Sequence, residues 1–231
     1  MSRASVTTFG RGVSFVASGE TGTQANEFEA AIKSVTSSTT VGAVFLYDTR
    51  SDSDGGAWRK KARGSWYYED LNTATRGGRR EFPSVALIVA DTASGSETVT
   101  IYDLDDVAAP MWLVFQMGGA SESSRNFSGR AGENANSLFA LNGRVMWGIN
   151  ADLSSGGVCI ADFANDAGRR HGTLASYTET GRVLSERNSA ILPQRMVGGL
   201  IVNGTVNDVA ATVLEGAEIG ALGLPIPTVA V

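Results

Sequence analysis

The sequence contains one cysteine and one histidine in 231 residues. Zinc fingers, iron–sulfur sites, disulfide scaffolds and His-based metal triads each need several such ligands brought together. The composition therefore excludes these sites, and we expect no metal and no other cofactor. Much of conventional catalysis is excluded with them.

Long hydrophobic runs are also absent. No apolar stretch approaches the roughly 18 residues that a membrane-spanning helix needs. The first residues, Met1 to Gly12, are small and polar where a signal peptide has an apolar core. We therefore expect a soluble protein that is made without export and does not bind a membrane.

Charge is scarce and unevenly placed. Charged residues make up 19% of the chain and apolar residues 42%, a balance that allows a core and argues against wholesale disorder. The net charge is -5, yet seven basic residues stand against two acidic ones between Arg59 and Arg80, so the rest of the chain carries about -10. Such a change of sign favours a patch for a protein partner over general affinity for nucleic acid.

Short apolar segments rich in β-branched and aromatic residues run through most of the chain. They end at Gly, Asn, Asp or Pro, which is typical of strands. One helix is expected over Thr23–Thr36, where Phe28, Ala31, Ile32 and Val35 line one face. We predict a mainly β protein with strands at Gly42–Tyr47, Ser65–Tyr68, Val85–Ala90, Thr98–Tyr102, Met111–Gln116, Leu138–Leu141, Arg144–Gly148, Val158–Ala161, Thr173–Tyr177 and Gly199–Val202.

Two features repeat along the chain. Three expected strands end on an aspartate that leads into an acidic turn, Asp48, Asp103 and Asp162, at spacings of 55 and 59 residues. Asn-Gly pairs at Asn142 and Asn203 each lie between apolar strands, 61 residues apart. Asn-Gly is a strong hairpin signal because a type I′ turn needs positive φ at both central residues. The pattern predicts an internal repeat of about 55 to 60 residues.

One such unit is expected from Ser137 to Tyr177, as four antiparallel strands in sequence with the fourth beginning at His171. This arrangement suits a blade of a β-propeller, while a β-sandwich with Asp and Asn-Gly at its turns is the alternative. We predict an N-terminal segment, residues 1–40, with one short helix, followed by a propeller-like domain of four-stranded antiparallel blades, residues 41–231. The chain stops within the expected third strand of the last blade, before its fourth strand. We therefore expect a fragment of a longer protein, a ring closed by Gly12–Ala17, or a missing strand supplied by a neighbouring subunit.

The segment from Ser51 to Trp58 resembles the Asp box of propeller hairpins. Short acidic side chains accept hydrogen bonds from the backbone of the turn, glycine permits positive φ, and tryptophan packs beside the next strand. An EF-hand register fails here because Arg50 and Lys61 fall where carboxylates are needed. The structural turn is predicted to use Ser51, Asp52, Asp54, Gly55, Gly56 and Trp58.

Nucleophilic catalysis has little support. No G-x-S-x-G surrounds any serine, Cys159 lies within an apolar strand, and His171 follows two arginines, so both residues are expected to be structural. Phosphate-loop and dinucleotide fingerprints are absent. Glycoside hydrolysis needs only two carboxylates, but 24 acidic residues offer no way to choose a pair. We predict that the protein is not an enzyme and has no catalytic residues.

Cations and aromatic side chains interleave from Trp58 to Tyr68, a combination that could hold single-stranded nucleic acid or glycan. If the tract is a strand, Trp58 and Lys60 share one face opposite Arg59 and Lys61. We then expect a hairpin with aromatic packing and a basic face that forms an interface, because arginine is enriched in protein contacts. The candidate interface or ligand surface is Arg59, Lys61, Arg63, Trp66, Arg76, Arg79 and Arg80.

Several blocks of sequence resemble virion structural proteins of marine tailed bacteriophages. The resemblance is dense from Val41 to about Phe115 and continues more weakly to the end of the chain, through Glu186-Arg187-Asn188 and Gly223–Val231. It implies longer chains with further β-repeats and a role in the tail or its fibres, and it supplies no catalytic residues. The blocks that carry it are Tyr47–Arg50, Asp52–Lys60, Ser65–Tyr67, Leu71–Gly77, Arg79–Pro83 and Thr100–Asp103.

These observations predict a structural component of a phage virion, a tail or tail-fibre protein made in the host cytoplasm. Its expected partners are other virion proteins and further copies of itself. The alternative is a propeller domain that binds or cleaves a glycan of the host surface. Binding of single-stranded nucleic acid by Trp58–Tyr68 is a third and weaker hypothesis.

Overall fold

The computed structural model describes most of the chain from residue 40 onward and two short strands before it. Strands 5–9, 13–17, 176–180 and 194–196 are described by their backbone alone. The described residues are 5–9, 13–17, 40–117, 127–129, 132–150, 156–172, 176–180, 184, 187–188, 194–196, 201–202 and 204–231.

The protein is mainly β, and all its sheets are antiparallel. A four-stranded sheet has the order β3-β4-β5-β6, so its strands lie side by side in the order in which they occur along the chain. Consecutive antiparallel strands of this kind form a meander. The strands are β3 (Val41–Asp48), β4 (Val85–Asp91), β5 (Thr98–Asp103) and β6 (Met111–Gln116).

A second, six-stranded sheet is also a meander, with the order β7 to β12. Two small hairpins, β1–β2 and β13–β14, complete the sheets. The strands of the six-stranded sheet are β7 (Asn134–Leu141), β8 (Arg144–Asn150), β9 (Gly157–Asp162), β10 (Ala167–Gly172), β11 (Ser176–Thr180) and β12 (Gln194–Met196). The hairpins pair β1 (Ser5–Phe9) with β2 (Val13–Ala17), and β13 (Ala210–Thr212) with β14 (Thr228–Ala230).

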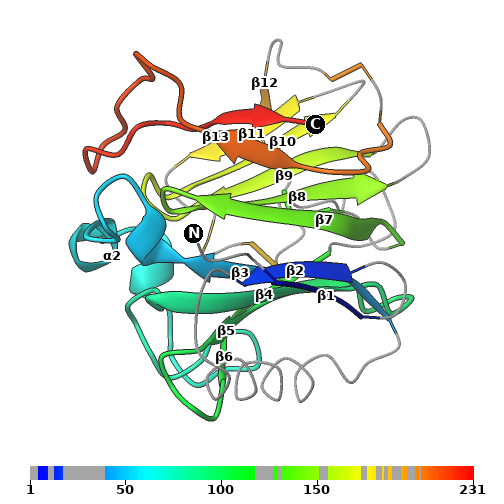
Figure 1. Ribbon diagram of the computed structural model, residues 1–231, viewed down its shortest axis with the longest axis horizontal. Helices are drawn as coiled ribbons and strands as arrows, with labels where there is room; N and C mark the ends of the chain where they lie inside the picture. Colours follow the sequence, from blue (N-terminus) through cyan, green and yellow to red (C-terminus); the bar gives the residue numbers. More distant parts are fainter. Residues whose placement is uncertain are drawn as a thin grey trace.

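The sheets lie in layers, with the six-stranded sheet between the four-stranded sheet and the β13–β14 hairpin (Figure 1). Alternation along β8 explains how this middle layer is buried on both faces. Val145 and Trp147 pack toward the four-stranded sheet, whereas Met146 packs toward the β13–β14 side. Successive side chains of a strand point to opposite faces, so a strand covered on both sides is apolar at every position.

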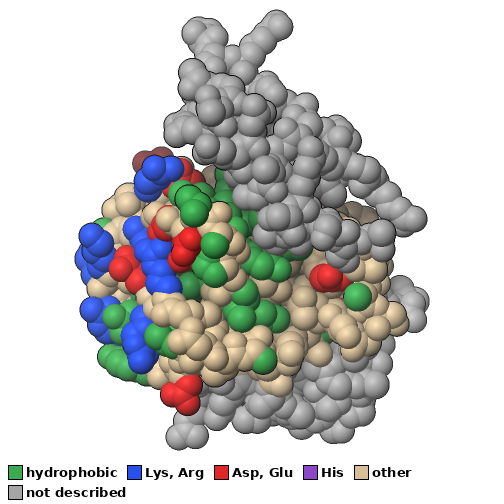
Figure 2. Space-filling view, turned by 90° about the horizontal axis from the view of Figure 1, so that it is seen from below, with side chains coloured by type: hydrophobic (Ala, Val, Ile, Leu, Met, Phe, Trp, Pro, Cys, Tyr) green, Lys and Arg blue, Asp and Glu red, His purple; other side chains and the backbone are tan. Residues whose placement is uncertain are grey.

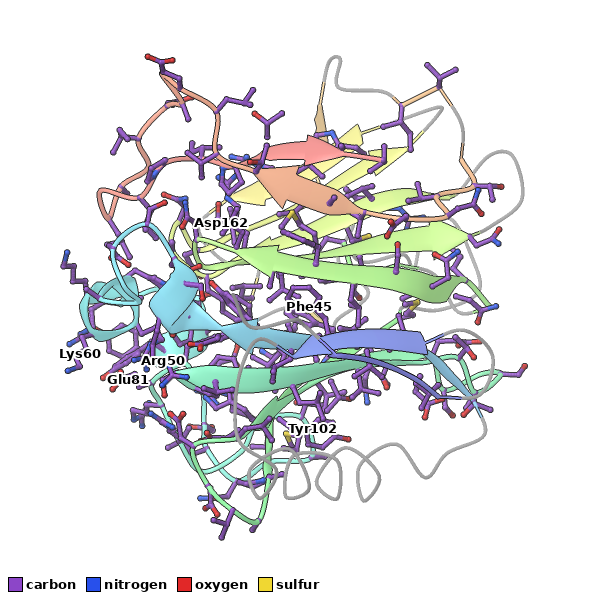
Figure 3. All side chains as sticks on the ribbon, viewed as in Figure 1. Phe45, Arg50, Lys60, Glu81, Tyr102 and Asp162 are labelled. Atoms are coloured by element: carbon purple, nitrogen blue, oxygen red, sulfur yellow. The ribbon has the colours of Figure 1, made fainter. Side chains whose placement is uncertain are left out.

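Aromatic side chains fill the space between the two large sheets at the end where β3 ends. Phe82 and Trp112 have ring centroids 4.8 Å apart, and Phe163 lies 5.0 Å from Phe82. Trp66 packs edge-on against Phe163 at 5.4 Å. Phe45 lies in the same layer, between the two sheets in Figure 3, with its ring centroid 5.2 Å from that of Phe139. Edge-to-face packing of this kind adds to the stabilisation that burial alone provides.

Most of the predicted strands are confirmed within a few residues at each end. Two predictions are wrong: Ser65–Tyr67 is a 3-10 helix, and Ile201 and Val202 belong to no strand. The unit predicted from Ser137 is a meander as expected, but its fourth strand is Ala167–Gly172, and two more strands follow it. The helix predicted at Thr23–Thr36 lies outside the described residues.

The aspartate repeat is two-fold in this structure. Asp103 and Asp162 each end the third strand of their meander, and both are buried. Asp48 ends a first strand instead, so it does not belong to the same series. The segment 1–40, predicted to contain one helix, holds the β1–β2 hairpin. The described strands form neither a closed barrel nor a closed ring of blades, and no helix of the described residues is long and apolar enough to cross a membrane.

Candidate functional site

The segment that joins β3 to β4, residues 49–84, carries all the candidate turn, interface and ligand residues that the sequence predicted; we call it the long loop. It contains η1 (Thr49–Ser51), α2 (Trp58–Lys61) and η2 (Ser65–Tyr67). The prediction that Trp58 and Lys60 share a strand face is therefore wrong. In the helical turn Trp58 is buried, and Lys60 and Lys61 are exposed.

Asp52 joins the start of the long loop to the neighbouring sheet. Its carboxylate accepts hydrogen bonds from the Tyr47 hydroxyl at 2.6 Å, from Trp58 Nε1 at 2.8 Å and from the backbone N–H of Asn142 at 2.7 Å. Asp52 is only 6% exposed. Burial raises the pKa of its carboxyl group, and the hydrogen bonds from Tyr47 and Trp58 oppose that rise.

The rest of the Asp-box-like turn is built as the pattern suggests. Asp54 accepts a hydrogen bond from the N–H of Gly56 at 3.0 Å. Gly55 and Gly56 have φ of 65° and 78°, a region that suits glycine. Ser51 is exposed. The turn is therefore architectural, and its one deeply buried carboxylate serves to hold a neighbouring turn.

That neighbouring turn is the Asn142-Gly143 pair between β7 and β8. Asn142 and Gly143 have φ of 51° and 73°, as a type I′ hairpin requires. The Asn142 side chain accepts from the N–H of Ser53 at 2.9 Å and donates to the carbonyl of Pro225 at 2.9 Å. One amide thus connects the long loop, the second meander and the segment before β14.

Two residues of the predicted interface are not at the surface, which corrects that prediction. Trp66 is fully buried and donates from Nε1 to the carbonyl of Phe163 at 3.0 Å. Arg76 is 1% exposed, lies over the ring of Trp112 at 4.3 Å and donates to the carbonyls of Trp112 and Arg80, both at 2.9 Å. Both side chains find partners in distant strands and turns, which the local sequence does not show.

Three more predicted residues have partners within the molecule, although Arg80 is exposed. Arg59 donates to Glu81 at 3.1 Å and to the carbonyl of Phe82 at 3.0 Å. Arg79 bridges Asp103 and Asp105 at 3.1 and 2.6 Å. The third, Arg80, donates to the backbone carbonyl of Tyr67 at 2.9 Å. The Arg79 contacts tie the long loop to the end of β5 and the turn after it, whereas the contacts of Arg59 and Arg80 lie within the long loop.

A small surface, here called the basic surface, consists of three exposed cations close together along the chain, Lys60, Lys61 and Arg63, with the exposed Tyr68. The side chains of Lys60 and Lys61 make no hydrogen bond or ion pair with the described part of the chain, and Lys60 points away from the body of the molecule in Figure 3. Arg63 stacks on Tyr67 at 4.6 Å, and Tyr68 is 64% exposed. Figure 2 shows Lys and Arg side chains gathered at one edge of the face seen from below, with Asp and Glu between them.

A cavity of about 220 Å³ opens beside the long loop, and Glu69, Arg76 and Arg187 are among its lining residues. Glu69 and Arg187 form an ion pair across 118 positions of sequence. The sequence reasoning selected Arg76 alone of these three. A buried charged pair this far apart along the chain leaves no local signal.

The single cysteine is fully buried, as predicted, and burial raises the pKa of the Cys159 thiol to about 12. His171 lies half-buried in β10. Within the described residues no three His, Cys, Asp or Glu side chains come together as metal ligands do.

Comparison with models of protein families, with curated proteins and with solved structures finds no match to this chain.

Proposed function

We propose that this protein is a structural component of a phage virion, a tail or tail-fibre protein that acts through protein–protein assembly. The resemblance behind this proposal is densest from Val41 to about Phe115, which covers the four-stranded sheet and the long loop. Several polar side chains of the long loop, among them Asp52, Trp66 and Arg79, join it to other parts of the molecule. Such use of charged residues suits a rigid building block better than a reaction centre.

The observation that carries the assembly proposal is the basic surface. Arg50 and Arg80 are exposed too, but Arg50 pairs with Asp48 and Arg80 donates to a backbone carbonyl. The side chains of Lys60 and Lys61 have no such partner among the described residues, and Arg63 and Tyr68 are exposed close to them along the chain. The chain outside Arg59–Arg80 carries about -10, so a second copy offers a complementary acidic surface. Exposed lysines contribute mostly to the rate and specificity of association, whereas Tyr68 offers contact area.

We also propose that the two meanders are successive units of a propeller-like repeat. Both run in chain order, they pack face to face, and the third strand of each ends on a buried aspartate, Asp103 or Asp162. The β13–β14 hairpin covers the outer face of the second unit. Stacked meanders with buried faces are how propeller blades hide their apolar sides.

The assembly proposal is tested by measuring mass in solution at several concentrations. We expect the wild-type chain to form oligomers that dissociate as salt is raised, because exposed charge pairs are screened. The double variant Lys60→Glu, Lys61→Glu is expected to be monomeric, while Lys60→Arg, Lys61→Arg keeps the charge and the oligomer. The virion role is tested separately by mass spectrometry of purified phage particles.

A strict monomer at high concentration, together with absence from particles, would overturn the proposal. An oligomer that is equally stable in the Glu and Arg double variants would place the interface elsewhere on the molecule and reject the basic surface as its site.

A further inference from the structure

The cavity beside the long loop brings two arginines to one carboxylate. Arg187 Nη1 donates to Glu69 Oε1, and Arg76 Nε lies 4.0 Å from Glu69 Oε2. The side chains of Arg76, Arg187 and Glu69 are 1%, 4% and 11% exposed. Two buried positive charges therefore share one largely buried negative charge.

Three further charges lie near this group. Asp166 acts on Glu69 and already accepts two hydrogen bonds from Ser65, and Arg80 adds a positive charge beside Arg76. Asp70 also lines the cavity, but Asp70 is exposed, so water screens its charge. Burial lowers the pKa of Arg76 to about 10; Glu69 opposes this, and the positive charges of Arg187 and Arg80 add to it. Arg76 is still charged at neutral pH. A buried charge without a full partner is costly, and an anion in the cavity would offset that cost.

Both guanidinium groups are held in place by the protein itself. Arg76 uses Nη1 and Nη2 on the carbonyls of Trp112 and Arg80. Arg187 donates to Glu69, to the carbonyl of Leu184 and, at 3.3 Å, to that of Thr75. The Nε atoms of the two arginines make no hydrogen bond. The positive charge is thus fixed before any ligand arrives, which reduces the cost of binding.

We propose that this cavity binds a small oxyanion: a carboxylate, sulfate or phosphate group. Its volume of about 220 Å³ equals that of about seven water molecules in the liquid, so it suits an oxyanion with at most one sugar ring. Thr73, Thr75 and Asn188 add hydroxyl and amide groups to its lining. Such an anion occurs free in solution and as the acidic group of a surface glycan.

The test is calorimetric titration of the full chain with sulfate, phosphate and glucuronate, at constant ionic strength kept with chloride. We expect saturable binding of at least one of them. Arg187→Gln should weaken binding about tenfold or more, because it removes a charge-assisted contact. Glu69→Gln should strengthen it, because it removes the competing carboxylate. Arg50→Gln, which removes an exposed arginine that pairs with Asp48, is the control and should bind as the wild type does.

Glu69→Gln keeps the test decisive if Arg187→Gln does not fold, as judged by circular dichroism. Fluorescence offers a second readout, because Arg76 lies over Trp112. A titration with acidic and neutral oligosaccharides distinguishes the sources: binding of only the acidic sugars assigns a glycan ligand, and binding of free sulfate or phosphate as well assigns a general oxyanion site. The absence of saturable binding at ligand concentrations up to about 100 mM, a hundred times a millimolar Kd, would overturn the proposal. Weaker binding by Glu69→Gln would overturn it as well. In either case both arginines would be structural.

Discussion

The two meanders differ most in how their first strand connects to their second. In the six-stranded sheet the Asn142-Gly143 turn joins β7 to β8 directly. In the four-stranded sheet the same connection is the long loop, which contains three short helices. Long insertions at a turn cost little closure entropy, but their polar backbone must find partners. Some of the partners of the long loop lie on the Asn142-Gly143 turn, which makes the corresponding connection in the other meander.

The buried aspartates show the same contrast. Asp162 pairs with Arg144 of the adjacent strand in its own sheet at 2.7 Å. Asp103 occupies the equivalent strand end but pairs with Arg79, which the long loop supplies at 3.1 Å. One meander is therefore completed by its own strands and the other by its insertion. Removing contacts of the long loop should therefore destabilise both sheets. Removing Arg144 should destabilise the six-stranded sheet, to which both Arg144 and Asp162 belong.

The largest effect is expected at the junction between the meanders. Asp52→Ala leaves the Tyr47 hydroxyl, Trp58 Nε1 and the Asn142 N–H without their acceptor in a buried site. At 1–3 kcal/mol for each unsatisfied group, we expect a loss of about 4 kcal/mol in the free energy of unfolding, measured by urea titration. Asp106→Ala is the control, because that exposed carboxylate accepts from a backbone N–H of its own turn, and it should cost less than about 1 kcal/mol. Similar losses for the two variants would contradict the role of Asp52.

The second prediction compares the two arginine–aspartate pairs. Arg144→Met strands the buried carboxylate of Asp162, which keeps only hydrogen bonds from Asn165, and should cost about 3 kcal/mol of unfolding free energy. Arg79→Met also leaves a buried carboxylate, Asp103, but this keeps the hydrogen bond from the N–H of Asp105, and Arg79 is 35% exposed, so a smaller cost of about 1 kcal/mol is expected. Urea titration of both variants measures the difference. Equal losses of unfolding free energy would mean that Arg79 of the long loop stabilises its sheet as much as Arg144 of a neighbouring strand does.

A third and smaller effect isolates the packing of the long loop on the Asn-Gly turn. Gly143 and Gly55 both have positive φ, 73° and 65°. A Cβ at Gly143 would lie 3.1 Å from Ala164 Cβ and 3.2 Å from the Trp58 ring, whereas a Cβ at Gly55 meets nothing within 4 Å. Gly55→Ala should therefore cost about 1 kcal/mol from backbone strain alone, and Gly143→Ala about 2 kcal/mol. Thermal melting of the two variants measures this difference. Equal shifts in melting temperature would show that the neighbours of Gly143, Trp58 included, move aside without cost.

Local patterns were enough to predict the regular strands and the turn. Alternating or continuous apolar runs placed β4 and β8, and Asn142-Gly143 marked its hairpin, because both signals depend on neighbours in the sequence. The segment of β10 has no such signal. It reads Ala-Gly-Arg-Arg-His-Gly, and its buried Arg170 is paired with Glu133, far away in the chain.

The candidate site shows the same limit more strongly. The tract from Trp58 to Tyr68 has a composition that fits a half-buried strand, yet hydrogen bonds to Asp52 and Phe163 and packing among distant aromatic rings impose helical turns. Tertiary contacts override local propensity in this way when a segment lacks a regular partner strand. The cavity depends on Glu69 and Arg187, whose pairing no local pattern encodes.

The smallest effect concerns the point where the long loop returns to β4. Asp105 accepts from the hydroxyl and N–H of Ser84, from the N–H of Val85 and from Arg79. Burial alone would raise the pKa of this carboxyl, but the donors outweigh it and lower the pKa to about 2. Because the folded pKa lies below the unfolded value of about 3.9, the stabilisation is present above that pH and is lost as the pH falls toward 2.

Asp105→Asn should therefore flatten the acid side of the stability profile between about pH 4 and pH 2. The effect should stay below about 1 kcal/mol, because Asp105 is at the surface. Asp52→Asn should act in the opposite direction, since the raised pKa of Asp52 makes its ionisation destabilising as the pH rises through that value. Urea titrations from pH 2 to pH 7 measure how each variant changes the pH dependence of stability. Changes of the same sign in Asp105→Asn and Asp52→Asn would mean that ionised carboxylates alone hold the long loop at both ends.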